Sequence, residues 1–553
     1  MRLPPKLLAI LFATTLCWST PLAATEKQTV CTITVNSSDE KEAFRRHLPA
    51  DKYQFVELVE RGRPDWLGSA CRAGISCDVL IVSGHFDGSS VFFSDRLEAN
   101  EHLPVDELER VSCSDSCTGL FSRLKEVHLF GCNTLNPQPL SSSSAEIVRS
   151  FVRDGQSLKE AKQQLRSLNA GHGESSRDRM RQVFKDVPVI YGFSSTAPLG
   201  PAAASTLTGF FRANGAHEIG KGRASRGLLG SFAPYGMTAT QGMTEQDPHA
   251  AVRRDVCQFA DDRLSDVKRL GFVHQLLQRK TGETRIHLDR IQKYVKLLDD
   301  PARRTPEVDH ALLGIAGDGA ARARFLDFAR DADRSEVRAR MLDVARDLGW
   351  LSAKERRDEL ATLLGELQTR SVVGMTEVDL ACTLNQEQDL NGAFSQRRSP
   401  EGAVENVAHA AVRACLGSTA GRARTLQGLV SPHDADVQIA RAYLRHRPIS
   451  DATELRQVAA DITLMRASDA QVRALEALGR HYVSDPEILG MLMRLYSETA
   501  SSSVQAAIAG ILLRSDRQSI ADARLLGILL KDRRRSPPGD DMVDALIHHL
   551  QAL

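Results

Sequence analysis

The sequence predicts an α/β domain with a parallel-rich sheet flanked by helices, followed by an all-α, solenoid-like domain. Three observations lead to this fold class. Up to about residue 215, apolar strand-like runs alternate with helical patterns, which is typical of parallel sheets. From about residue 245, Ala, Leu, Arg and Asp with helical periodicity replace the β-branched runs. At 553 residues the chain is too long for one hydrophobic core, so at least two domains are expected.

Residues 1–24 are typical of a bacterial secretory signal peptide. Two positive charges precede an apolar run from Leu7 to Trp18, and small residues follow up to Ala24. The apolar run is too short to span a bilayer as a mature helix. We therefore expect a periplasmic or secreted protein with no membrane segment after signal cleavage. The alternative is an uncleaved anchor.

The α/β domain is expected at residues 28–215. Two of its runs, Cys77–Ser83 and Glu126–Phe130, are almost continuously apolar, as in strands buried on both faces. The predicted strands are Thr29–Val35, Tyr53–Val59, Cys77–Ser83, Glu126–Phe130 and Val187–Phe193. The predicted helices are Asp39–His47, Pro64–Arg72, Val105–Val111, Ala145–Arg153 and Leu158–Leu168. Residues 216–245 are expected to be a linker.

Residues 246–553 are expected to form a helical repeat domain. Short related helices recur there, and their aligned valines, Val407, Val437, Val472 and Val504, lie 30 to 35 residues apart. This spacing indicates stacked helix pairs that are similar to HEAT repeats. Such an array is expected to bind a protein substrate or partner.

The charge balance excludes several partners. The chain has 71 basic and 70 acidic residues, whereas nucleic acids and polybasic membrane contacts require a one-sided field. No Gly-rich phosphate loop, G-x-S-x-G elbow or H-E-x-x-H motif occurs. We therefore expect no cofactor, no metal and no nucleic-acid partner.

Cysteine parity predicts one reactive thiol. The chain has 10 cysteines, and one of them, Cys17, lies in the signal segment. An odd number remains in an oxidising compartment, so at least one thiol is left over. Two pairs are candidate disulfides: Cys113 with Cys117, which form an isolated CxxxC, and Cys382 with Cys415, which lie one repeat apart.

A histidine and a cysteine follow two of the buried strands. Gly84-His85 comes directly after Cys77–Ser83, and Gly131-Cys132 comes directly after Glu126–Phe130. Functional groups collect at the carboxyl ends of parallel strands, and a nearby base activates a thiol as a nucleophile. Gly84, Gly88 and Gly131 would bring bare N–H groups close to a developing oxyanion. The alternative is a core histidine and a buried free cysteine.

These motifs resemble a peptidase family. DVLIVSGH followed by VHLFGCNTL is similar to the caspase-like cysteine peptidases of clan CD, particularly the CHAT and bacterial caspase types. The resemblance covers residues 28–215 and implies that Cys132 is the nucleophile and His85 the general acid/base. It also implies an oxyanion hole made by the N–H of Cys132 and a glycine near His85. The family usually has glycine directly after the histidine, whereas this chain has Phe86 and then Gly88.

The resemblance also suggests substrate contacts. The run Val189–Pro201 resembles the family's last core strand and substrate wall, which makes Ser194 and Ser195 candidate substrate-binding residues. Asp87 is a candidate for steering a basic substrate group, or else it caps a turn. The expected function is an exported cysteine endopeptidase that acts on a protein or peptide. The alternative is a catalytically inactive caspase-like protein acting as an interaction scaffold.

Overall fold

The structure is a computed structural model that describes most of the chain. The described residues are 27–58, 67–94, 101–138, 144–153, 155–172, 175–247, 250–393, 406–481, 483–515, 523–534 and 542–551. The segment predicted to be a signal peptide lies outside them. Internal contacts divide the chain into two compact units, Met1–Phe272 and Val273–Leu553.

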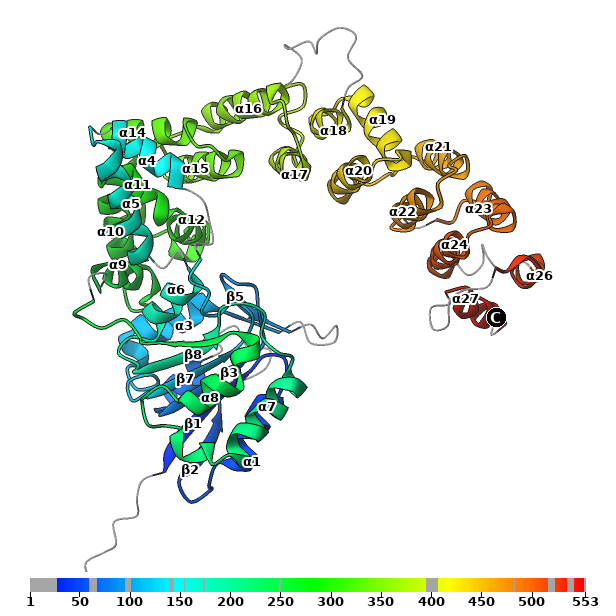
Figure 1. The fold of residues 1–553 in the computed structure, drawn as a ribbon. Helices are drawn as coiled ribbons and strands as arrows, with labels where there is room; N and C mark the ends of the chain where they lie inside the picture. The colour runs from blue at the N-terminus through cyan, green and yellow to red at the C-terminus, as the bar shows by residue number, and fades with distance from the viewer. Residues whose placement is uncertain are drawn as a thin grey trace, which may run out of the picture. The chain divides into compact units, whose positions relative to one another are not determined.

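A six-stranded sheet forms the centre of the first unit (Figure 1). Its order is β2-β1-β3-β7-β8-β9, and all neighbours are parallel except β8 and β9. The strands are β1 (Gln28–Thr34), β2 (Tyr53–Glu57), β3 (Val79–Ser83), β7 (Glu126–Phe130), β8 (Val189–Phe193) and β9 (Met237–Thr240). A small antiparallel sheet contains β4 (His85–Phe86), β5 (Val91–Phe93) and β6 (His102–Pro104). The α/β class predicted from the sequence is thus confirmed at this level.

Helices cover both faces of the large sheet, because alternate side chains of its buried strands point to opposite sides. α1, α7 and α8 lie on one side and α3 and α6 on the other (Figure 1). Phe130 of β7 packs with the first group, and Leu129 with the second. The helices of this unit are α1 (Asp39–His47), α2 (Gly68–Arg72), α3 (Val105–Cys113), α4 (Ser144–Arg153), α5 (Leu158–His172), α6 (Ser176–Val183), α7 (Gly200–Arg212), α8 (Arg226–Ser231) and α9 (Ala250–Ala260). The predicted helix at Pro64–Arg72 is shorter, and its first residues lie outside the described part.

The segment predicted to be a linker, residues 216–245, is part of the α/β unit instead. It contains α8 and β9, and β9 pairs with β8 along Ile190 to Phe193. Leu228 and Phe232 of this segment are fully buried in the core beside the sheet. The short β9 has only one buried residue, so it lacks the apolar run that marks the other strands.

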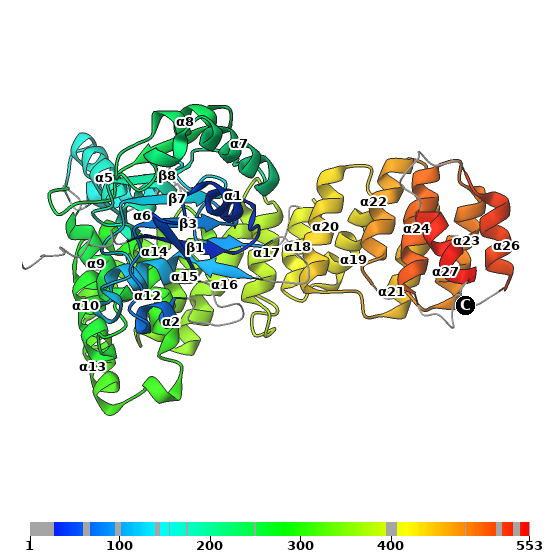
Figure 2. The same cartoon turned by 90° about the horizontal axis from the view of Figure 1, so that it is seen from below.

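The second unit consists of helices. They are α10 (Asp266–Gln278), which spans the unit boundary, α11 (Thr281–Ile286), α12 (Leu288–Leu297), α13 (Pro306–Ala316), α14 (Gly319–Arg330), α15 (Ser335–Asp347), α16 (Ala353–Thr369), α17 (Met375–Leu384), α18 (Val407–Cys415), α19 (Thr419–Gln427), α20 (Asp434–His446), α21 (Ala452–Thr463), α22 (Ser468–Leu478), α23 (Pro486–Glu498), α24 (Ser502–Arg514), α26 (Ala523–Asp532) and α27 (Met542–Gln551). Figure 2 shows α20, α22 and α24 following one another. Among the described helices, none has both the length and the apolar character needed to cross a bilayer.

Helix caps and a buried glutamine recur along this unit. The side chains of Ser418, Asp451 and Asp485 cap the starts of α19, α21 and α23 at intervals of 33 and 34 residues. Gln471 and Gln505 are buried, and each donates to the carbonyl nine residues before it. The helix caps thus recur every 33 to 34 residues, whereas Val472, one of the aligned valines, is only half-buried. Gln471 of α22, rather than Val472, is equivalent to Gln505 of α24, because both glutamines are buried and make the same hydrogen bond.

Within the described residues, four disulfides cross-link the chain: Cys31–Cys77, Cys71–Cys117, Cys113–Cys257 and Cys382–Cys415. The predicted pairing of Cys382 with Cys415 is confirmed, since these residues lie on the packed helices α17 and α18. The predicted pairing of Cys113 with Cys117 is wrong.

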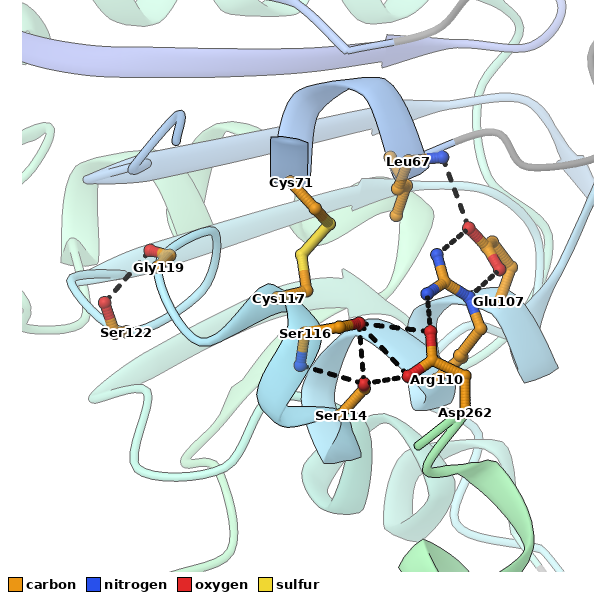
Figure 3. Close-up of a disulfide and its surroundings, with 10 residues drawn as sticks. All are labelled: Leu67, Cys71, Glu107, Arg110, Ser114, Ser116, Cys117, Gly119, Ser122 and Asp262. Carbon is orange, nitrogen blue, oxygen red and sulfur yellow. Dashed lines mark hydrogen bonds and ion pairs between the residues drawn. A yellow bond between two sulfur atoms is a disulfide. The ribbon is translucent and has the colours of Figure 1, made fainter. Parts of the chain in front are cut away.

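The short turn between these two cysteines explains the error. The side chain of Ser114 accepts from the N–H of Ser116 and starts a 3₁₀ turn at Asp115–Cys117. Cys113, at the end of α3, then bonds to α9, while Cys117 bonds to α2. Figure 3 shows Cys71–Cys117 beside Asp262, which accepts hydrogen bonds from Ser116 and Arg110.

The disulfide between α3 and α9 should stabilise the first unit strongly. Replacing Cys113 and Cys257 by Ser is expected to lower that unit's free energy of unfolding by about 2–5 kcal/mol, because the cross-link closes a long loop. Urea unfolding in non-reducing buffer measures the loss. The matched control, Cys382→Ser with Cys415→Ser, should leave the first unit's transition unchanged. An unchanged transition in the Cys113/Cys257 variant would contradict the assigned pairing.

Candidate functional site

The parallel register brings the two sequence-predicted reactive residues to one edge of the sheet. β3 and β7 are neighbours, and Ser83 at the end of β3 pairs with Phe130 at the end of β7. His85 follows Ser83 by two residues, and Cys132 follows Phe130 by two residues. Both residues therefore lie at the carboxyl edge of the sheet, just after adjacent strands.

The backbone approaches closely between these strand ends. A Cβ atom on Gly131 would lie 2.9 Å from the carbonyl oxygen of Gly84 and 2.9 Å from the Cβ of Phe86. The residue before Cys132 thus touches both residues that flank His85. Only glycine fits at position 131, because any side chain would push the two strand ends apart.

The small antiparallel sheet holds His85. His85 pairs with Phe93 across β4 and β5, and the two rings lie 5.5 Å apart between centroids. Phe86 is buried and packs on Phe92 at 4.6 Å. Phe86 is therefore a core residue of this hairpin, and it fixes the strand that carries the histidine.

Cys132 is the free cysteine of the described residues, as parity predicted, and it is partly exposed. The backbone N–H of Ala197 donates to its Sγ at 3.4 Å. An N–H directed at sulfur stabilises negative charge on that sulfur. The thiol thus has both solvent access and a donor for its charged form, as a nucleophile requires.

A ladder of hydrogen bonds, here called the Cys132 ladder, joins the Cys132 turn to the segment after β8. The two segments are antiparallel and are joined by three hydrogen bonds. These run from Leu135 N–H to Phe193 O (2.9 Å), from Asn133 N–H to Ser195 O (2.8 Å) and from Ala197 N–H to Cys132 Sγ (3.4 Å). Asn133 has a φ of 58°, which lets the turn reverse beside Cys132.

The two candidate substrate-binding serines differ in their surroundings. Ser195 is exposed, and its carbonyl is part of the Cys132 ladder, so it lies beside the nucleophile candidate. The hydroxyl of Ser194 donates to the carbonyl of Gly236 at 3.2 Å. Ser195 is therefore exposed beside Cys132, whereas Ser194 secures the segment after β8 to the loop before β9.

The three glycines proposed as oxyanion elements have separate roles. The N–H of Gly84 donates to the carbonyl of Phe130 at 3.2 Å, so it is already used and does not serve as an oxyanion donor. Gly131 supplies the close approach of the strand ends. Gly88 has a φ of +83°, and a Cβ on it would lie 3.8 Å from the Cβ of Asn133. In the described part of the chain, no hydrogen bond involves the N–H of Gly88 or of Cys132.

Asp87 caps its own turn. Its Oδ1 accepts from the N–H groups of Ser89 and Ser90 at 2.7 Å and of Val91 at 3.1 Å. Burial works against the charged carboxylate, but these bonds outweigh it and hold the pKa of Asp87 below its usual value. The carboxylate is thus occupied by the loop, which fits the capping alternative better than substrate steering.

Sequence reasoning missed three residues of this edge: Ala197, Thr134 and Glu40. Ala197 contributes only a backbone N–H, and Thr134 a buried hydroxyl, so neither stands out as a chemical group in the sequence. Glu40 is in the first turn of α1, where an acidic residue normally offsets the helix dipole in solvent. Its burial, at 4 % exposure, has no signal in the sequence.

Glu40 should make stability pH-dependent. Desolvation by burial raises its pKa from 4.5 to about 7. Because the folded state holds the proton more tightly, the contribution of Glu40 to stability is fully present below pH ~4.5 and is lost as the pH rises through about 7. The free energy of unfolding of Glu40→Gln, relative to that of the wild type, should therefore rise by roughly 3 kcal/mol between pH 4 and pH 8.

Urea unfolding of both proteins across this pH range tests the expectation. The control is Glu42→Gln, on the exposed side of the same helix, which should follow the wild type at every pH. A difference between Glu40→Gln and wild type that does not change with pH would contradict the burial argument.

Comparison with known proteins returns no counterpart for this chain: no family model, no curated protein and no solved structure matches it.

Proposed function

We propose that this protein is a caspase-like cysteine endopeptidase in which Cys132 is the nucleophile and His85 the general acid/base. The observation that carries the proposal is the thiol of Cys132, which is free, partly exposed and hydrogen-bonded by the N–H of Ala197. The contact of Gly131 with the residues flanking His85 supports a working pair. The resemblance of both strand-end motifs to the clan CD peptidases supplies the preference for peptides.

The proposed reaction has two stages. His85 takes the proton from Cys132, and the thiolate attacks the carbonyl carbon of the scissile peptide bond. The N–H groups of Cys132 and Gly88 stabilise the oxyanion that forms. His85 then gives its proton to the leaving amine, which leaves a thioester on Cys132. Water, deprotonated by His85, hydrolyses the thioester and releases the acid product.

We further propose that the second unit is a HEAT-like array that holds a protein substrate or partner, and that the protein is exported. The recurring helix caps and buried glutamines support a repeat, and stacked repeats present extended binding surfaces. The four disulfides support an oxidising compartment such as the periplasm or the exterior.

Active-site substitution tests the peptidase proposal. The wild type should be labelled by peptide ketone probes of varied P1 residue, and it should cleave the peptides that correspond to the best probes. Cys132→Ala should abolish labelling, and His85→Ala should slow cleavage on the order of 10³-fold, because each removes a partner of the dyad. Mass spectrometry of the labelled protein locates the modified residue.

The matched control is His102→Ala, an exposed histidine of the same small sheet, which should keep full activity. Equal labelling and cleavage by Cys132→Ala and wild type would refute the peptidase proposal. A wild type that no probe labels, although iodoacetamide alkylates Cys132, would favour the inactive scaffold.

A further inference from the structure

Thr134 forms the buried inner end of the Cys132 ladder. Its side chain is 0 % exposed, and its hydroxyl makes two hydrogen bonds to the backbone. The hydroxyl donates to the carbonyl of Gly131 at 3.1 Å and accepts from the N–H of Phe193 at 3.0 Å. It therefore ties the residue before Cys132 to the end of β8.

The hydroxyl of Thr134 makes a hydrogen bond to β8 beyond the point where β7 and β8 stop pairing. The register of β7 with β8 stops at His128 and Tyr191, so the two strand ends separate beyond this point. The N–H of Phe193 is satisfied by the side chain of Thr134 instead of a backbone carbonyl of β7. The turn that carries Cys132 is thus held to the end of β8 by the hydroxyl of Thr134 and by the N–H of Leu135, which donates to the carbonyl of Phe193.

The local sequence makes room for this hydroxyl. A Cβ atom on Gly192 would lie only 2.6 Å from Oγ1 of Thr134 and 2.8 Å from Cγ of Leu135. Glycine at position 192 is therefore the residue that lets the hydroxyl reach the end of β8. Leu135 is fully buried, so the base of the ladder is also protected from water.

We propose that Thr134 is a positioning residue for the Cys132 thiol. Its hydroxyl fixes the base of the Cys132 ladder, and the ladder in turn keeps the N–H of Ala197 directed at Sγ. Both hydrogen bonds of the Thr134 hydroxyl are made with backbone groups of Gly131 and Phe193, so its effect on the thiol is transmitted through the turn. The inference rests on the proposed role of Cys132 as the nucleophile.

Substitution of Thr134 tests the inference through the reactivity of the thiol. Thr134→Val keeps the shape of the side chain but removes both hydrogen bonds, and Thr134→Ser keeps the hydroxyl. We expect Thr134→Val to slow alkylation of Cys132 by iodoacetamide at pH 7 about tenfold, which corresponds to about 1.4 kcal/mol, the size of one typical hydrogen bond. Labelling by the peptide ketone probe should slow similarly, and Thr134→Ser should restore both rates to within about threefold.

A matched threonine separates positioning from stability. Thr425 is also fully buried, and its hydroxyl donates to the carbonyl of Gly421 in the second unit. Thr425→Val should cost stability without changing the alkylation rate of Cys132. A thermal melt of each variant shows that it is folded before its rate is measured. If Thr134→Val does not fold, Thr134→Ala, which puts no methyl group against Gly192, takes its place.

Two results would overturn the inference: a folded Thr134→Val with the wild-type alkylation rate, or a Thr134→Ser as slow as Thr134→Val. Iodoacetamide reacts with the thiol whether or not the protein is a peptidase. Cleavage by Cys132→Ala would therefore refute the proposed function, while the alkylation rates would still decide the role of Thr134.

Discussion

The absence of a side chain at Gly131 is the constraint on which the candidate site depends. β3 and β7 are central strands buried on both faces, so their ends are fixed in register by the core. Beyond the last paired residues, the N–H of Gly84 donates to the carbonyl of Phe130, and Gly131 allows the carbonyl of Gly84 and the Cβ of Phe86 to approach. A bulkier residue would have to move either the core strands or the hairpin that carries His85. The placement of the His85 and Cys132 backbone at one edge of the sheet is thus a consequence of the packing below them.

The disulfides leave Cys132 as the unpaired thiol among the described cysteines. Cys31–Cys77 and Cys71–Cys117 lie in the core beneath one face of the large sheet, and Cys113–Cys257 secures α9 to α3. Each disulfide removes two nucleophilic thiols and reduces the conformational freedom of the unfolded chain. Cys132 is at the sheet edge rather than in a helix contact, and no second sulfur is bonded to it. An oxidising compartment would therefore leave one reactive sulfur in a cross-linked framework.

The sequence predicted strands best where burial on both faces produces a long apolar run. The run Glu126–Phe130 matches β7 to the residue, because a strand buried on both faces is mostly apolar, and Glu126 and His128 are its two polar residues. β9 was missed because a short, half-exposed edge strand has no such run. The partner of Cys113 was missed because Cys257 is 144 residues away, and only the packing of α3 on α9 brings the two together. Ala197 and Thr134 were missed for a related reason: a backbone N–H or a buried hydroxyl acquires a role only from the direction in which the fold points it.

The turn after His85 is built around the bulky side chain of Phe86. Its side chain fills the core of the hairpin against Phe92, so a glycine at this position would leave a cavity there. The turn therefore continues for two more residues before it needs a positive φ, which Gly88 supplies at +83°. Asp87 caps that turn, and Gly88 comes to lie against Asn133, the residue after Cys132. Gly88 thus lies beside the turn that carries Cys132, although two residues separate it from His85.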